Sequence, residues 1–260
     1  MEDRAMKHPS RVPRREFLGF TAAIGAWPFI GPVESILSAS ARDAHLESRP
    51  VDAPSGLVAV GERPLGLGLD RDGLVYVPRG YDPSRPVALA VMLHGAGRSA
   101  QNMNFGYSLA DELGVVLIAP DSRESTWDAI LGDPGPDIEF IDAALKSVFS
   151  RVRVNPAKIA MMGFSDGASY ALSLGLANGD FFTHVVAFSP GFIPRNPRRG
   201  KPRVFESHGT QDRVLPIDAT SRVIVPGLKA QGYDLLYREF DGPHRVLPEI
   251  AREAFEWFVK

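Results

Sequence analysis

The sequence predicts an α/β protein in which a mostly parallel central sheet is covered by helices on both faces. From about residue 74 to the end, continuous apolar runs of strand length alternate with segments of helical periodicity. Strands buried on both faces of a parallel sheet read in this way. A second observation is Gly163-Phe164-Ser165-Asp166-Gly167, which lies between an apolar run and a small-residue helical pattern. This G-x-S-x-G pattern predicts a strand, a sharp turn and a helix.

The individual elements follow from these patterns in chain order. Apolar residues at 138, 141, 144, 145 and 148 recur at helical spacing and predict an amphipathic helix. Further helices are expected after Ser165, near Pro216 and over 248–258. No internal repeat or linker indicates a second domain. The predicted strands are 74–77, 87–93, 115–119, 159–162, 185–188, the start of 204–212, and 235–240.

The N-terminal residues predict a targeting segment that precedes the fold. A basic head at Arg11, Arg14 and Arg15 is followed by an apolar stretch over 17–27 and by the small-residue pattern Ala39-Ser40-Ala41. These features are typical of a secretory signal peptide, and the apolar stretch is short for a bilayer span. We therefore expect a signal peptide over 1–41, a flexible lead-in over 42–55 and one catalytic domain over 56–260.

The stretch Arg14-Arg15-Glu16-Phe17-Leu18 resembles the twin-arginine export signal, although Pro13 and Gly19 depart from the usual pattern. This resemblance implies the twin-arginine export machinery as a partner and a periplasmic or extracellular location. A general-secretion signal and an uncleaved anchor are the alternatives. No stable membrane span is expected in the mature form.

Composition excludes several classes of function. The formal net charge of −2 argues against a nucleic-acid partner that is held by phosphate contacts. The chain has no cysteine, which excludes disulfides, thiolate metal sites and a cysteine nucleophile. The histidines show no ligand-pair spacing, so neither a metal nor an organic cofactor is expected.

Ser165 is the candidate nucleophile because a serine at such a turn projects its hydroxyl clear of the sheet edge. Attack on a carbonyl creates an oxyanion, which backbone N–H groups stabilise well. The glycine-rich segment His94-Gly95-Ala96-Gly97 follows the 87–93 strand and can supply one such group. We expect the amides of Ala96 and Asp166 to form the oxyanion hole, although a simple tight turn is the alternative for 94–97.

A serine hydroxyl needs a general base, and in this arrangement an acid and then a histidine should follow the serine along the chain. The 204–212 segment reads as a strand that opens into a loop containing Asp212, and His244 follows the last predicted strand. His244 would take the proton of Ser165, and Asp212 would orient the imidazole. The competing histidines are expected to have other places. His208 should hold the acid loop through hydrogen bonds, His184 should be packed or on the surface, His94 precedes the serine, and His8 and His45 lie in the N-terminal segments. Of the competing acids, Asp241 is too near His244 in sequence to face it, and Asp234 should lie at the opposite strand end.

These residues together resemble the α/β-hydrolase superfamily, in particular its phospholipase/carboxylesterase and related serine-esterase branches. The matching stretches run from about Leu74 to the end and include Leu93-His94-Gly95, the Ser165 pentapeptide, His208-Gly209-Thr210-Gln211-Asp212 and Gly242-Pro243-His244. The resemblance implies the α/β-hydrolase fold, with Ser165, Asp212 and His244 as a catalytic triad. Asp166 departs from the family, which often carries Gln there, and this puts the choice of substrate in doubt. The sequence has no long insertion that would form a large lid domain, so none is expected.

Two segments are expected to shape specificity. The loop over 122–136 could wall an acyl pocket, and its Trp127 is either a substrate platform or plain loop packing. His94 and Gly95 are further candidates for substrate contact. A basic cluster, Arg195, Arg198, Arg199, Lys201 and Arg203, could meet anionic esters or lipid head groups, or could be a solvated loop.

The sequence thus predicts an exported serine esterase that acts on a small-molecule or lipid-like ester. A serine peptidase or a thioesterase on the same fold is the nearest alternative, because the same triad serves all three. A non-catalytic binding protein is the alternative from another class, and the intact triad argues against it.

Overall fold

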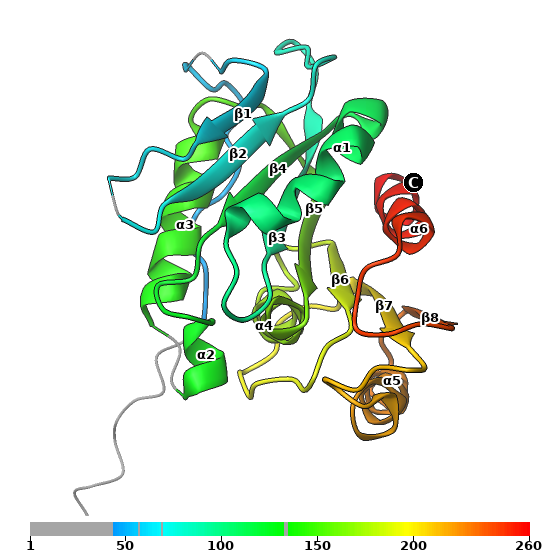
Figure 1. The fold of residues 1–260 in the computed structure, drawn as a ribbon. Coiled ribbons are helices and arrows are strands. Elements are labelled where there is room, and N and C mark those ends of the chain that lie inside the picture. The colour runs from blue at the N-terminus through cyan, green and yellow to red at the C-terminus, as the bar shows by residue number, and fades with distance from the viewer. Residues whose placement is uncertain (1–43, 57, 69, 133–134) are drawn as a thin grey trace, which may run out of the picture. The chain divides into compact units, whose positions relative to one another are not determined.

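The central element of the protein is an eight-stranded sheet, seen in a computed structural model that describes residues 44–56, 58–68, 70–132 and 135–260 (Figure 1). The strand order is β1-β2-β4-β3-β5-β6-β7-β8. Strands β1 and β2 pair antiparallel with their neighbours, and all pairs from β4 to β8 are parallel. The predicted mostly parallel sheet is confirmed. The strands are β1 Gly61–Pro64, β2 Gly73–Val77, β3 Val87–Leu93, β4 Val115–Pro120, β5 Val154–Phe164, β6 His184–Phe188, β7 Arg203–Gly209 and β8 Leu235–Phe240.

Helices cover both faces of the sheet, as predicted. The side chains of β3 alternate between the faces. Leu89, Val91 and Leu93 pack with α3 (Pro136–Phe149) and α4 (Asp166–Ala177), whereas Ala90 and Met92 pack with α1 (Tyr107–Leu113) and α6 (Pro248–Val259). A third cluster joins α4 and α5 to β6 and β7. The helices are η1 Ala100–Gly106, α1 Tyr107–Leu113, α2 Asp128–Leu131, α3 Pro136–Phe149, α4 Asp166–Ala177, η2 Ile217–Ala219, α5 Ser221–Ala230 and α6 Pro248–Val259.

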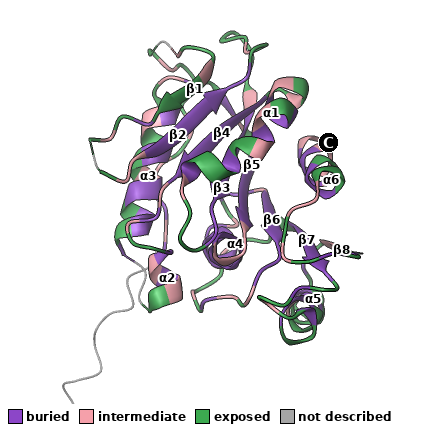
Figure 2. Ribbon diagram, in the orientation of Figure 1, coloured by how far each residue is buried: buried purple, intermediate pink, exposed green. Residues whose placement is uncertain are grey.

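Burial of the strands on both faces explains why the sequence has continuous apolar runs. Every residue of β2, β4 and β6 is buried, whereas the edge strand β1 is largely exposed (Figure 2). Helix α4 is buried from Gly167 to Ala177, which accounts for its small and apolar residues. Within the described part of the chain, no helical domain is inserted between the strands, in agreement with the predicted lack of a large lid.

Some short elements escaped prediction. Strand β1 has the sequence Gly-Glu-Arg-Pro and three exposed residues, so it carries no apolar run. It is an edge strand, where a proline such as Pro64 is tolerated. Helices η1, α1 and α2 are too short for a helical period to emerge, and β5 begins at Val154, upstream of the predicted run.

The segment expected to be a flexible lead-in differs from the prediction over its described part. Leu46 is fully buried, and its amide donates to Oδ1 of Asn178 at 2.8 Å. The amides of Glu47 and Ser48 both donate to Oδ1 of Asp142 at 2.8 Å. These contacts attach the segment to α3 and to the end of α4. The predicted signal peptide over 1–41 lies outside the described residues.

None of the helices in the described residues is both long enough and apolar enough to cross a membrane.

Candidate active site

Ser165 lies at a sharp turn between β5 and α4 and has the strained backbone that the sequence predicts. Its φ is 58° and its ψ is −123°, a conformation that costs a non-glycine residue about 1–3 kcal/mol. Its amide donates to the carbonyl of Phe188 at 2.9 Å. The flanking glycines are required by close backbone approach, because a Cβ at Gly163 would lie 2.1 Å from the carbonyl oxygen of Gly167.

The structure brings the three predicted triad residues together from three strand ends. His244 Nε2 lies 2.9 Å from Ser165 Oγ, and His244 Nδ1 lies 2.6 Å from Asp212 Oδ2. A carboxylate only accepts, so Nδ1 carries the hydrogen, and Nε2 is free to accept the serine proton. Nucleophile, base and acid therefore have the connectivity that acyl transfer needs.

The environment of Asp212 keeps it ionised. Burial raises the pKa of this carboxyl. Hydrogen bonds from the Leu215 amide and from His244 lower the pKa, and together the lowering effects outweigh that of burial, so the pKa lies below its ordinary value. The amides of Val214 and Leu215 both donate to Oδ1 at 2.8 Å. Hydrogen bonds to the charged form favour it. Asp212 is thus fixed as an anion before any substrate binds.

His208 supports the acid loop, in the manner predicted for it. Its Nε2 lies 2.8 Å from the Leu215 carbonyl oxygen and 3.1 Å from Asp212 Oδ2, and its Nδ1 lies 2.6 Å from Ser221 Oγ. Burial lowers the pKa of His208, which favours the neutral ring. The Leu215 and Asp212 oxygens only accept, so the hydrogen of the neutral ring lies on Nε2.

The rival groups lie elsewhere. Asp241 accepts a hydrogen bond from Gln211 Nε2 at 2.6 Å, and Asp234 pairs with Arg203 ahead of β8, away from the triad. His184 is buried against Trp257 and Phe258, and burial lowers its pKa to about 4. These placements agree with the predictions for His184, Asp234 and Asp241. His8 lies outside the described residues.

The two amides predicted for the oxyanion hole lie on segments that meet at Ser165. A Cβ at Gly95 would lie 3.2 Å from the Cβ of Ser165, so the loop after β3 touches the serine directly. Within the described residues, the amides of Ala96 and Asp166 donate no hydrogen bond, whereas the neighbouring Gly97 amide donates to Ser125 at 2.7 Å. Asp166 is also the first residue of α4, where the helix dipole favours negative charge.

The Asp166 side chain is bonded to the loop after β4. Its Oδ2 accepts a hydrogen bond from the Thr126 hydroxyl at 2.8 Å. The residue that departs from the family pattern therefore links α4 to the loop after β4. Phe164, which the sequence analysis overlooked, places its ring 4.8 Å from the His244 imidazole. Its position inside the G-x-S-x-G pattern was the available signal.

His94 and Trp127, expected as substrate contacts, are fully buried instead. His94 Nδ1 donates to the Gly95 carbonyl at 2.8 Å, and its Nε2 accepts from the Ser122 amide at 3.0 Å. Trp127 Nε1 donates to the His94 carbonyl at 2.9 Å, and its ring stacks on Tyr170. These contacts agree with the packing alternative for Trp127, and both residues pack within and against the 94–97 loop. Gly95 is also buried and contributes its close approach to Ser165.

The loop that carries Trp127 is organised by two carboxylates. Asp137 accepts from the amides of Arg123 and Asp128 at 2.6 and 2.7 Å. Asp128 in turn accepts from Gly135, Asp137 and the Tyr170 hydroxyl. Burial raises the pKa of Asp137 to about 6, against the lowering effect of its amide donors. The loop thus has a defined shape beside the site, and its role as an acyl wall stays a prediction.

Apolar side chains are exposed on the segments that follow three strands at the edge of the sheet where Ser165 lies. Leu131 follows β4, Phe192 follows β6 and Val214 follows β7, with exposures of 62%, 48% and 65%. Part of the basic cluster has protein partners: Lys201 donates to the Gln231 carbonyl, Arg198 to the Gln231 side chain, and Arg203 pairs with Asp234. These bonds favour the solvated-loop interpretation for those residues.

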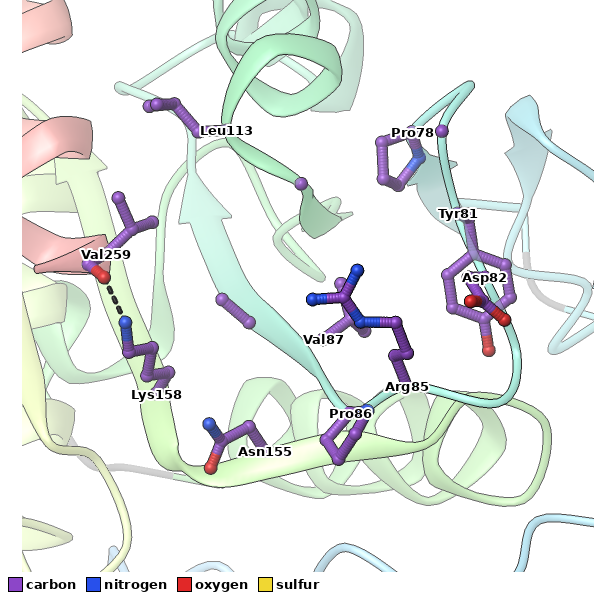
Figure 3. A pocket seen from close by; sticks show the side chains of 13 residues that line it. Pro78, Tyr81, Asp82, Arg85, Pro86, Val87, Leu113, Asn155, Lys158 and Val259 are labelled. Atoms are coloured by element: carbon purple, nitrogen blue, oxygen red, sulfur yellow. Dashed lines mark hydrogen bonds between the residues drawn. The ribbon is translucent and has the colours of Figure 1, made fainter.

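A cavity of about 440 Å³ lies at the other end of the sheet (Figure 3). Its lining includes Val87 and Ala88, which begin β3, and Lys158, which donates to the carbonyl of Val259. Because Ser165 follows the opposite end of β5, this cavity is separate from the candidate active site.

Comparisons with known proteins identify the family and the fold. Residues 66–223 match a family model described as "Putative esterase". The chain is 30% identical over 157 residues to feruloyl esterase C of Emericella nidulans, and the match covers 57% of each chain. It is 28% identical over 158 residues to probable feruloyl esterase C of Aspergillus oryzae, again with 57% of each covered. The matched region thus spans 57% of the length of these curated relatives.

Solved structures with the same fold include esterases and serine hydrolases. A CE1 ferulic acid esterase from Anaeromyces mucronatus, in complex with ferulic acid, aligns with a TM-score of 0.58 at 18% identity, over 73% of this chain and 84% of that one. A fluorophosphonate-binding serine hydrolase of Staphylococcus aureus aligns with a TM-score of 0.61 at 15% identity, over 79% and 100%. These likenesses show that the fold is the α/β-hydrolase fold, as the sequence predicted.

Proposed function

Because the chain belongs to the esterase family that this model describes, we propose that it is a serine hydrolase that cleaves carboxylic esters. The observation that carries the proposal is the hydrogen-bonded series from Ser165 Oγ through His244 to Asp212, with distances of 2.9 and 2.6 Å. Such a series activates a hydroxyl that is otherwise a weak nucleophile at neutral pH.

In the proposed mechanism, Ser165 Oγ attacks the ester carbonyl while His244 Nε2 takes its proton. Asp212 stabilises the resulting imidazolium but does not itself become protonated. The amides of Ala96 and Asp166 donate to the oxyanion, and losing one such donor typically costs about 100- to 1000-fold in rate. His244 then returns the proton to the leaving alcohol. A water molecule releases the acyl group by the same steps in reverse order.

For the substrate, we propose a small or lipid-like ester with an apolar acyl or alcohol part. The exposed side chains of Leu131, Phe192 and Val214 support this, because each follows the carboxyl end of a strand, at the edge of the sheet where Ser165 lies. The names of the relatives bring esters of hydroxycinnamic acids such as ferulic acid into the set to be tested. A peptidase or a thioesterase would use the same triad, so the leaving group has to be measured. A binding protein without catalysis would not need the strained Ser165.

We further propose that the protein is exported. The support is the sequence pattern of residues 1–41, with Arg14 and Arg15 ahead of an apolar stretch and Ala39-Ser40-Ala41 behind it. Replacing both arginines by lysine should stop export through the twin-arginine route, which fractionation of cells that express the full chain would show. Continued export would favour the general-secretion alternative.

The test of the enzymatic proposal is hydrolysis of p-nitrophenyl acetate, butyrate, octanoate and palmitate, together with methyl ferulate, a thioester and a peptide p-nitroanilide. Ser165→Ala serves as the matched variant. Ester hydrolysis that disappears in Ser165→Ala is the expected result, and the acyl profile measures the size of the pocket. A folded protein that cleaves only the thioester or the anilide would favour the alternatives, and one that cleaves nothing would refute the proposal.

A further inference from the structure

A second cavity, the α1–α6 cavity, lies between the first residues of helices α1 and α6 and has no role in the proposed mechanism. Its volume of about 550 Å³ falls within the range of about 300–1,000 Å³ that is typical of small-molecule sites. One wall comes from the end of η1 and the start of α1, through Phe105, Ser108 and Leu109. The opposite wall comes from Val246 and from the start of α6, which includes Ala251.

The two helices place this cavity toward the sheet edge that carries Ser165. Their last residues, Leu113 and Val259, line the 440 Å³ cavity together with Val87, which begins β3 (Figure 3). The first residues of both helices therefore lie toward the other end of the parallel strands, where β3, β5 and β8 finish. Ser165 follows β5 at that end. The α1–α6 cavity and the candidate nucleophile thus belong to the same edge of the sheet.

Each wall of the α1–α6 cavity is also close to a member of the triad. Val246, in one wall, lies two residues after His244. Phe105, in the other wall, has its ring edge-on to that of Phe188 at a centroid distance of 6.3 Å. Phe188 ends β6, and its carbonyl accepts the Ser165 amide at 2.9 Å. The cavity therefore lies between a residue of the base loop and a residue that packs beside the nucleophile.

Phe164 relates the two walls to the candidate base. Its ring lies 4.8 Å from the His244 imidazole. Like Phe105 and Val246, Phe164 is a partly buried member of the apolar cluster between the sheet and helices α1 and α6. The apolar cluster that borders the cavity thus also borders the imidazole that is expected to take the serine proton.

The charges of the lining favour an uncharged ligand. Arg252 is paired with Glu112 of α1 by two hydrogen bonds of 2.7 and 2.9 Å, and Glu256 lies 3.6 Å from it. The other charged residue of the lining is Glu249, an exposed carboxylate. Because the guanidinium is already paired, an incoming group meets a negative charge, which disfavours an anionic ligand. An apolar, uncharged group is the chemistry that suits this cavity.

We propose that the α1–α6 cavity is the subsite for the apolar part of the ester substrate, its acyl chain or its alcohol, with Phe105, Leu109 and Val246 as walls. The proposal rests on the proposed function and states where that activity recognises the length of its substrate. It places this recognition on the face covered by α1 and α6, whereas Trp127 of the predicted acyl wall packs in the cluster on the other face.

Ser108→Trp is the variant that tests this subsite. Ser108 lines the cavity from an exposed position on α1, so an indole at this position should occupy the cavity without replacing a triad residue. Ser108→Ala removes the same hydroxyl and adds no bulk. Val223→Trp adds the same side chain at a position of α5 that is 62% exposed and is not part of the cavity lining. Both are matched controls.

The kinetic measurement is kcat/KM, from titration of the released acid, for methyl acetate, methyl hexanoate and its isomer pentyl acetate. In Ser108→Trp, methyl acetate should stay within about twofold of the wild type, whereas at least one longer ester should lose roughly tenfold or more. A loss on methyl hexanoate assigns the cavity to the acyl chain, and a loss on pentyl acetate assigns it to the alcohol. The same ratio to the wild type on all three esters, or an equal loss in either control, would overturn the proposal.

A second measurement separates failure of this proposal from failure of the proposed function. Methyl ¹³C NMR of Ser165→Ala follows the signals of Leu109, Ala251 and Val223 while methyl hexanoate or pentyl acetate is added. The Leu109 and Ala251 signals should shift and that of Val223 should not, and adding Ser108→Trp should abolish the shift. If the signals shift but the wild type hydrolyses no ester, the proposed function is wrong and the cavity stands as an apolar binding site. If the wild type hydrolyses both esters and the signals stay unchanged, the cavity is not the subsite.

Discussion

A Cβ placed on Gly167 would lie 2.2 Å from the carbonyl oxygen of Leu93, so the first turn of α4 and the end of β3 meet backbone to backbone. This contact brings the loop with Ala96 next to Ser165. The predicted oxyanion hole depends on this approach, because its two amides come from segments about 70 residues apart in the chain.

Gly167→Ala should therefore destabilise the protein strongly. The added methyl group meets rigid backbone atoms, and overpacking of this kind typically costs about 1–3 kcal/mol or more. Chemical denaturation and ester hydrolysis would measure the loss. Gly227→Ala is the matched control, because a Cβ there meets nothing within 4 Å. It should leave activity intact and raise stability by up to about 1 kcal/mol, as alanine does in an exposed helix. Equal behaviour of the two variants would contradict the close approach.

Asp212→Asn should lower kcat by about 10⁴-fold, because an amide can stabilise the wrong tautomer of the base. KM for a short p-nitrophenyl ester should change much less. Asp241→Asn is the control for a nearby carboxylate that is bonded to Gln211 rather than to His244, and it should retain nearly full activity. A greater loss in Asp241→Asn than in Asp212→Asn would mean that the acid is assigned wrongly.

Asp166→Asn tests whether residue 166 contributes to catalysis only through its backbone amide. The amide nitrogen is unchanged in this variant, and Asn can still accept from the Thr126 hydroxyl. We expect kcat to stay within about fivefold of the wild type, whereas Ser165→Ala should lose activity by several orders of magnitude. A loss of 100-fold or more in Asp166→Asn would show that the carboxylate itself takes part.

The stability of the wild type should decline with rising pH in the window set by Glu206. Glu206, on β7, is fully buried, and burial raises its pKa to about 8 from the ordinary value of 4.5. A group of this kind contributes stability that is complete below its unfolded pKa and is lost as the pH rises through the folded pKa. Each unit of difference corresponds to about 1.4 kcal/mol. Glu206→Gln should remove this dependence, so its free energy of unfolding should improve relative to the wild type between pH 5 and 9. Parallel stability profiles of the two proteins would argue against a buried, protonated Glu206.

Leu46→Ala should show that the segment ahead of β1 is part of the folded domain. Leu46 is fully buried, and truncating such a side chain typically costs about 2–5 kcal/mol. Val51→Ala, at a side chain with 44% exposure in the same segment, should change stability by less than about 0.5 kcal/mol. Thermal unfolding of both variants would measure the difference. A Leu46→Ala protein as stable as Val51→Ala would support the prediction that this segment is a flexible lead-in.

The sequence alone determined the strands of the sheet core, the turn at Ser165 and the chain order of Ser165, Asp212 and His244. Strands buried on both faces, such as β3, must be apolar throughout, and a strained turn between close-packed segments must carry glycines at 163 and 167. These demands act over a few residues, so they leave a local pattern that can be read.

Tertiary structure decided the features that depend on which segments meet. Trp127 stands in a glycine- and proline-rich loop, and only its contacts with His94 and Tyr170 show that it packs against the 94–97 loop. In the sequence, Leu46 lies in a polar segment that resembles a flexible leader. Only the hydrogen bonds to Asn178 and Asp142 show that this segment is attached to the domain. The support that His208 gives to Asp212 likewise depends on Ser221, which lies on a different element. Burial and hydrogen bonding between distant segments have no local periodicity, so no window of sequence reveals them.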